Sequence, residues 1–155
     1  MIGSAGYLEK GITMGIRGTM QKLELSNLVR FLGTSNDVAH FLREADIFVH
    51  PSIHDTQPYS VMEAQLTGLP VLVSNTAGLP EMVEVGRSGL VSSVGNIHEL
   101  YYQLRYLLEN DILRKQLAEC TKEWAKNGGP LIPWLIMFCH CISRLKLWKQ
   151  KIQCK

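Results

Sequence analysis

Short, almost wholly apolar runs alternate along this chain with segments whose apolar residues recur at helical spacing. Residues 70–74 (PVLVS) are apolar nearly throughout, as expected of a parallel strand that is covered on both faces. Further strands are predicted at 1–3, 28–33, 47–50 and 88–94, and helices at 7–25, 37–45, 59–67 and in two successive apolar stripes after Ile97. This alternation predicts an α/β fold with a doubly wound parallel sheet.

Two of the expected helices have recognisable ends. In 37–45, apolar residues recur at i, i+3, i+4 and i+7, which predicts an amphipathic helix capped near Asn36. The helix 59–67 follows Pro58, whose fixed φ suits a helix start and whose missing N–H costs nothing there. Gly68 is expected to end that helix.

The most informative motif is 55–64 (DTQPYSVMEA), directly after the apolar run 47–52. The strand would deliver the chain to the carboxyl edge of the sheet, and the helix would begin there. The free N–H groups of Tyr59, Ser60 and Val61 would then point at the space where open α/β folds hold a phosphate.

Two carboxylates bracket this helix start. Asp55 would lie in the loop before the helix and Glu63 inside its first turns. A pair placed in this way can hold sugar hydroxyls on either side of a diphosphate.

Four segments in register indicate a family: 45–52 (ADIFVHPS) with Glu63-Ala64, 68–73 (GLPVLV), 77–81 (AGLPE) and 86–91 (GRSGLV). In these segments the chain resembles the retaining glycosyltransferases of the GT-B fold, family four, over roughly residues 1 to 125. The family motif is two Glu separated by seven residues and followed by Ala. The resemblance implies a Rossmann-like C-terminal half that binds a nucleotide-sugar at 1–127, followed by an atypical tail at 128–155.

The resemblance implies catalytic roles for both carboxylates. Glu63 matches the family's second acidic residue, which holds the ribose hydroxyls, and two adjacent hydroxyls suit a bidentate carboxylate. Asp55 stands in place of the first Glu, which contacts the transferred sugar, and is one methylene shorter. The alternatives are a solvated helix glutamate and a turn-forming aspartate.

Further contacts follow from the same resemblance. Thr56 and Gln57 stand where the family often has Gly and an apolar residue, so they add polar groups beside the donor. Gly78 would lie near the nucleotide and Gly33 near the base; the alternatives are a tight turn and a plain strand-end glycine. His50 and His54 are interpreted as wall or loop residues. The predicted nucleotide-sugar contacts are Gly33, Thr56, Gln57, Pro58, Tyr59, Ser60, Val61, Glu63 and Gly78.

Compared with the family pattern, the chain lacks the N-terminal, acceptor-binding domain. It also lacks the opening segment whose Arg and Lys neutralise the leaving diphosphate, usually a large part of the catalysis. The family transfers sugar from a UDP-sugar or GDP-sugar to a glycan, lipid or small acceptor with retention, without a metal or other cofactor. We therefore expect donor binding with little transfer. The alternatives are a non-catalytic remnant and a subunit completed by a separately encoded N-terminal domain.

Composition limits which binding partners and which cellular compartment are expected. A net charge of +2 argues neither for nor against an anionic partner, but no basic stripe interleaved with aromatics is present, so no nucleic-acid partner is expected. The four cysteines form no CxxC pair, which favours reduced thiols and a cytoplasmic protein. The start of the chain has no basic end followed by an apolar run, so no signal peptide is expected.

The tail breaks the α/β pattern. An apolar run at 131–142 is followed by basic residues, and about twelve apolar residues are too few to cross a bilayer as a helix. One interpretation is an interfacial amphipathic helix that gives weak association with the inner membrane face. The other is a segment foreign to the fold, as a truncated or frameshifted gene would leave, and it is the one we favour.

Overall fold

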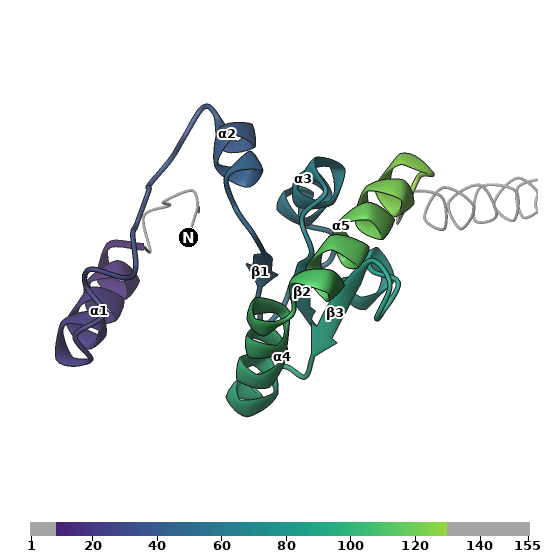
Figure 1. The fold of residues 1–155 in the computed structure, drawn as a ribbon. Helices are drawn as coiled ribbons and strands as arrows, with labels where there is room; N and C mark the ends of the chain where they lie inside the picture. Colours follow the sequence, from purple (N-terminus) through teal and green to yellow (C-terminus); the bar gives the residue numbers. More distant parts are fainter. Residues whose placement is uncertain (1–8, 130–155) are drawn as a thin grey trace, which may run out of the picture. The chain divides into compact units, whose positions relative to one another are not determined.

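The computed structural model of the chain describes residues 9–129. These fall into two compact units, one ending at Phe41 and the other beginning at Leu42. The first contains helix α1 (Glu9–Lys22), and α2 (Val38–Arg43) crosses the boundary. The second contains β1 (Phe48–His50), α3 (Tyr59–Thr67), β2 (Val71–Ser74), the short 3-10 helix η1 (Pro80–Met82), β3 (Gly89–Ser92), α4 (Ile97–Glu109) and α5 (Asp111–Lys126) (Figure 1).

The three strands form one parallel sheet in the order β1-β2-β3. Phe48 pairs with Val71, and Val71 in turn pairs with Gly89. All four residues of the central strand β2 are buried, as its apolar sequence predicts. The apolar run 47–50 predicts a buried strand, but β1 is only partly buried, because among the described strands it has a neighbour on one side only.

One face of the sheet packs against α4 and α5. Leu72 of β2 forms a fully buried cluster with Leu107 of α4 and Leu117 of α5. The partly buried residues around it are Ile47, Val49, Leu90, Leu100, Leu104 and Leu113. The sequence predicts one apolar stripe on α4, formed by Ile97, Leu100, Tyr101, Leu104, Leu107 and Leu108. Three of these side chains, Ile97, Tyr101 and Leu108, are exposed.

The opposite face is also buried, since Val71 of β2 points away from Leu72 and has no exposed surface. α3 and η1 are joined to each other and to α5. The Gln65 Nε2 of α3 donates to the Met82 carbonyl of η1 at 2.7 Å, and the same carbonyl accepts from Trp124 Nε1 of α5 at 3.1 Å. Helices therefore cover both faces, which confirms the predicted doubly wound α/β arrangement.

Helix ends follow local chemistry. Gly68 ends α3 in the left-handed conformation, at φ 86°, and its N–H bonds back to Ala64 and Gln65, which confirms the predicted stop. The cap of α2 is Asp37, the residue next to Asn36, since Asp37 Oδ1 accepts from the His40 N–H at 3.0 Å.

The predicted strand at 28–33 is wrong. The N–H groups of Leu28 and Val29 both donate to the Leu25 carbonyl and close a turn after α1. No described segment of the first unit offers a strand to pair with, and Leu28 is 80% exposed. The strand predicted at 1–3 and nearly all of the tail 128–155 lie outside the described residues.

Candidate functional site

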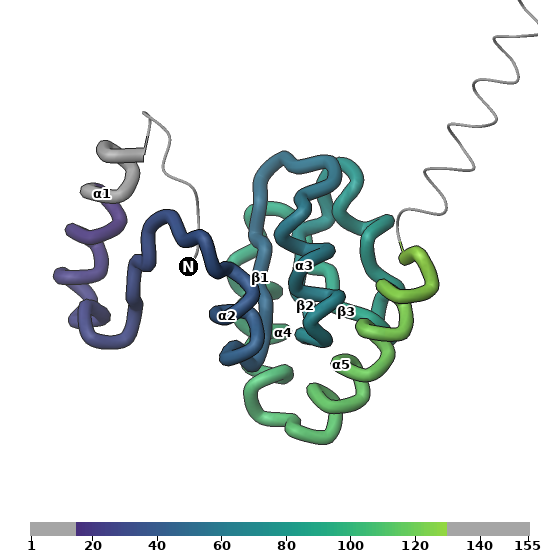
Figure 2. The backbone as a smooth tube through the Cα atoms, turned by 90° about the horizontal axis from the view of Figure 1, so that it is seen from above, coloured from purple at the N-terminus to yellow at the C-terminus, as the bar shows by residue number. Residues whose placement is uncertain are grey.

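Two loops meet at the carboxyl edge of the parallel sheet, which is where open α/β folds place their ligands. The first loop, 51–58, joins β1 to α3, and the second, 75–79, joins β2 to η1. Figure 2 shows the two loops arching side by side above the strands. The first carries Asp55, Thr56, Gln57 and Pro58, and the second carries Gly78.

Direct contacts join the two loops. Thr76 Oγ1 donates to the Ile53 carbonyl at 3.0 Å. Gly78 is buried against Thr56, and a Cβ at Gly78 would lie only 2.2 Å from the Thr56 carbonyl oxygen. Only glycine permits this approach. Gly78 is therefore needed for the close approach of the neighbouring loop. The place of Gly78 near a nucleotide stays a prediction.

The start of α3 is open toward the same edge. Its N-cap, Pro58, is extended at φ −68° and ψ 125°, and no side chain caps it. The N–H groups at a helix start have no partners within the helix, so those of Tyr59 and Ser60 can bind an anion. The expectation that the Val61 N–H is also free is wrong, because it donates to the Pro58 carbonyl at 3.1 Å in a tight first turn.

Asp55 is held by a residue to which the sequence assigned only a wall or loop position. His50 Nε2 lies 3.0 Å from Asp55 Oδ2, with the two side chains 23% and 33% exposed. The His50 ring also stacks on Phe48, two residues earlier on β1, at an interplanar angle of 7°. The two residues are five positions apart in a strand end and a loop, so neither helix nor strand periodicity would have predicted this pair.

Glu63 and Gln57 have polar atoms without protein partners. Glu63 is exposed, and among residues 9–129 none forms a hydrogen bond or ion pair with its carboxylate. Gln57 Nε2 is buried and has no hydrogen-bond partner in the described part of the chain. Leaving a buried donor unpaired costs about 1–3 kcal/mol, so this nitrogen is a candidate for a ligand contact.

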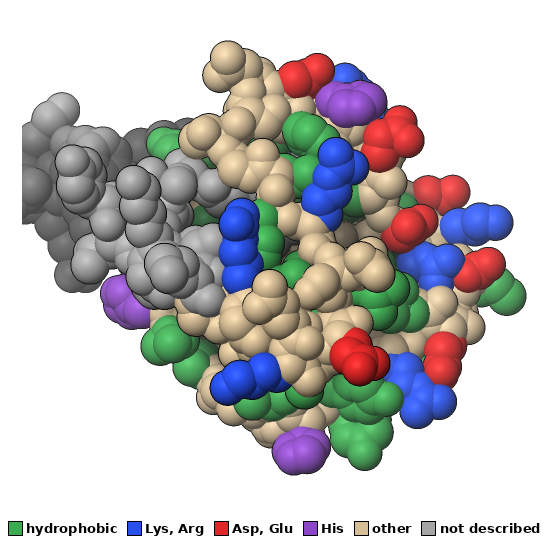
Figure 3. Space-filling model, turned by 90° about the vertical axis from the view of Figure 1, so that its left-hand side faces the viewer, with side chains coloured by type: hydrophobic (Ala, Val, Ile, Leu, Met, Phe, Trp, Pro, Cys, Tyr) green, Lys and Arg blue, Asp and Glu red, His purple; other side chains and the backbone are tan. Residues whose placement is uncertain are grey.

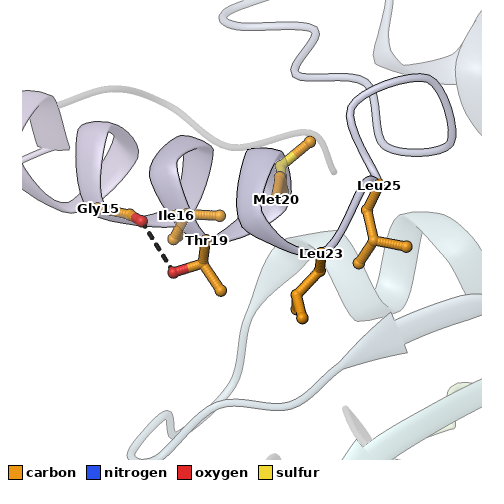
Figure 4. A pocket seen from close by; sticks show the side chains of 6 residues that line it. All are labelled: Gly15, Ile16, Thr19, Met20, Leu23 and Leu25. Atoms are coloured by element: carbon orange, nitrogen blue, oxygen red, sulfur yellow. Dashed lines mark hydrogen bonds between the residues drawn. The ribbon is translucent and has the colours of Figure 1, made fainter.

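Gly33, the predicted base contact, belongs to the first unit. It has φ +68° and open space around its Cα. The same unit has an apolar pocket along α1 and the turn after it, which contains none of the predicted site residues (Figure 4). Its lining residues are Gly15, Ile16, Thr19, Met20, Leu23 and Leu25.

On the face shown in Figure 3, acidic and basic side chains are interspersed with hydrophobic ones. Within 9–129, no group of three or more His, Cys, Asp and Glu is placed to hold a metal ion. None of the helices there is long and apolar enough to cross a bilayer. Cys120 is a free thiol.

The sequence from 15 to 124 matches the family model described as "Glycosyl transferases group 1". The chain belongs to this family. Among its relatives is an N,N'-diacetylbacillosaminyl-diphospho-undecaprenol alpha-1,3-N-acetylgalactosaminyltransferase of Campylobacter jejuni, 35% identical over 94 residues. That match covers 61% of this chain and 25% of the relative.

Solved structures confirm that this group 1 glycosyltransferase chain has the fold of the C-terminal domain of GT-B enzymes. Anabaena HepE, solved with UDP and separately with UDP-glucose, superposes with a TM-score of 0.80 for the UDP complex, at 23% identity over 92% of this chain. The C-terminal domain of Francisella tularensis LpcC superposes with a TM-score of 0.71 at 17% identity, over 79% of this chain and 65% of that one. The chain spans 40% of HepE.

Proposed function

We propose that this chain is the donor-binding part of a retaining glycosyltransferase and that it binds a nucleoside diphosphate sugar at the carboxyl edge of its sheet. The observation that carries the proposal is the juxtaposition of an uncapped helix start, Pro58–Tyr59, with Asp55 on the preceding loop and the unpaired Glu63 on the same helix. HepE, which shares the fold, is a protein that binds UDP and UDP-glucose.

Each group has a distinct role in the proposal. The N–H groups of Tyr59 and Ser60 face the diphosphate, where the helix dipole favours negative charge. Glu63 accepts from two ribose hydroxyls, and Asp55 accepts from a hydroxyl of the transferred sugar. Gly33 and Gly78 keep their proposed places beside the base and the nucleotide, and Thr56 beside the donor.

Transfer in the family relies on an Arg and a Lys that neutralise the leaving diphosphate, which is usually a large part of the catalysis. In the family pattern both belong to an opening segment that is not matched in this sequence. We therefore propose that the 155-residue chain binds donor with little or no turnover. A separately encoded acceptor domain would be the partner that restores transfer.

We expect Glu63→Ala to weaken nucleotide-sugar binding about 10- to 100-fold, which corresponds to the net loss of one charge-assisted hydrogen bond worth roughly 1.5–3 kcal/mol. The measurement is calorimetric titration of the full chain with UDP, GDP and their sugars. Glu119→Ala is the matched control, since Glu119 is also an exposed helical glutamate but lies on α5. Binding that is unaffected by Glu63→Ala would contradict the assignment of Glu63, and a folded chain without binding would favour the remnant.

Gln57→Met should have opposite effects on stability and binding. The substitution replaces the buried, unpaired Nε2 by an apolar group of similar size, so unfolding free energy should rise by up to about 1 kcal/mol. If the nitrogen serves the donor, affinity for the nucleotide-sugar should fall a few-fold. Urea denaturation measures the change in unfolding free energy, and titration of the same protein measures the change in affinity. A loss of stability with unchanged affinity would assign Gln57 a structural role.

A further inference from the structure

We propose that His50 is a positioning residue that orients the Asp55 carboxylate toward the transferred sugar, and that it thereby controls the affinity for the sugar part of the donor. The observation is the His50 Nε2···Asp55 Oδ2 contact of 3.0 Å between partly buried side chains. This inference rests on the proposed function and extends it to a residue outside the family motif.

The imidazole is itself held in place from two directions. His50 is the last residue of β1, and its backbone is in register with Val73 of the central strand. Its ring lies parallel to that of Phe48, which projects from the same face of the strand, with centroids 6.3 Å apart. The direction of the ring is therefore set by the sheet and not by the loop that it contacts.

The contact defines what each partner can do. An ionised carboxylate only accepts hydrogen bonds, so His50 Nε2 carries the proton and donates to Oδ2. Oδ2 is thereby occupied, and Oδ1 has no hydrogen-bond partner among the described residues, which leaves it for a ligand hydroxyl.

The shorter side chain explains why an anchor matters at this position. Aspartate has one methylene fewer than the glutamate of the family motif, so the position of its carboxylate depends more directly on the backbone of the loop. That backbone is held by Thr76 at Ile53 and by Gly78 at Thr56. His50 adds a third point of attachment, at the carboxylate itself.

The test compares a nucleotide with its nucleotide-sugar, using the full chain. The ligands are UDP and GDP, each beside a panel of its glucose, galactose, mannose and N-acetylhexosamine conjugates, and the best-bound conjugate is used for the variants. For His50→Leu, which removes the donor at similar volume, we expect affinity for that conjugate to fall about five- to tenfold. Affinity for the free nucleotide should change less than twofold.

Two further variants separate positioning from packing. His50→Gln keeps an N–H donor at a similar reach and should retain the affinity for the nucleotide-sugar within about threefold. His98→Leu changes an exposed histidine on α4, outside the two loops of the site, and should leave both affinities unchanged. When His50→Leu is added to Asp55→Asn, the affinity for the nucleotide-sugar should not fall further, because the two residues act as one unit.

The outcomes are distinct. If His50→Leu weakens nucleotide and nucleotide-sugar equally, or if His50→Gln fails like His50→Leu, the positioning role is overturned while donor binding stands. A His50 ring-nitrogen NMR shift that Asp55→Asn does not move would overturn it independently of any ligand. If the folded wild-type chain binds none of the ligands, the proposed function fails and this inference fails with it.

Discussion

Leu72→Ala is expected to lower the free energy of unfolding by about 2–5 kcal/mol, the range for removing a fully buried leucine and leaving a cavity. Leu72 has no exposed surface and lies on the central strand β2. It packs with Leu107 and Leu117, so the cavity would open between the sheet and both covering helices. Small domains are stable by only about 5–15 kcal/mol, and this loss is a large part of that.

Urea denaturation followed by circular dichroism measures the effect. Leu66→Ala is the matched control, because Leu66 is on α3 with 55% of its surface exposed. Its loss should stay within about 0.5 kcal/mol. A difference between the two variants of less than about 1 kcal/mol would contradict the placement of the core between β2 and the helices α4 and α5.

Gly78→Ala is expected to damage stability and donor binding together. The new Cβ would lie 2.2 Å from the Thr56 carbonyl oxygen. Rotating a side chain cannot relieve this clash, because Cβ and the carbonyl oxygen are both fixed to the backbone. The two loops must separate, at a cost of about 1–3 kcal/mol in unfolding free energy. Because Asp55 immediately precedes Thr56, we also expect nucleotide-sugar affinity to fall about tenfold.

Denaturation and titration of the same preparation test both parts. Gly18→Ala is the control, since it adds the same methyl group in α1, where only the helix's own backbone and the two neighbouring residues lie within 4 Å. There the substitution should stabilise the helix by up to about 1 kcal/mol. If Gly78→Ala retained both wild-type stability and wild-type affinity, the close approach of the two loops would be disproved.

Much of the second unit could be predicted from local sequence. The apolar run of β2, the stop at Gly68 and the start of α3 after Pro58 each depend on residues close together in the chain. The motif 55–64 and the segments in register with it predicted the family, which the match over 15–124 confirmed. Such features can be predicted from sequence because hydrophobic periodicity and backbone preference depend on only a few neighbouring residues.

Predictions from local sequence failed where the structure of a segment depends on contacts with other segments. Residues 28–33 have the apolar character of a strand but form a turn instead, because a strand needs a neighbour to receive its hydrogen bonds. The apolar stripe of α4 marked an amphipathic helix correctly, but only packing decided that Leu107 is buried and Leu108 exposed.

The order of strands and helices in the second unit and the family could be read from the amino-acid sequence alone. The sequence also predicts Asp55 and Glu63 as the acidic pair of the site. The three-dimensional structure was needed to show that His50 holds Asp55, that Gly78 lies against Thr56 and that the Val61 N–H is already bonded. The first two contacts join segments that are separate along the chain, and the third depends on the conformation of one helical turn. No periodicity encodes such contacts, because they arise where folding brings the strand ends and their loops to one edge of the sheet.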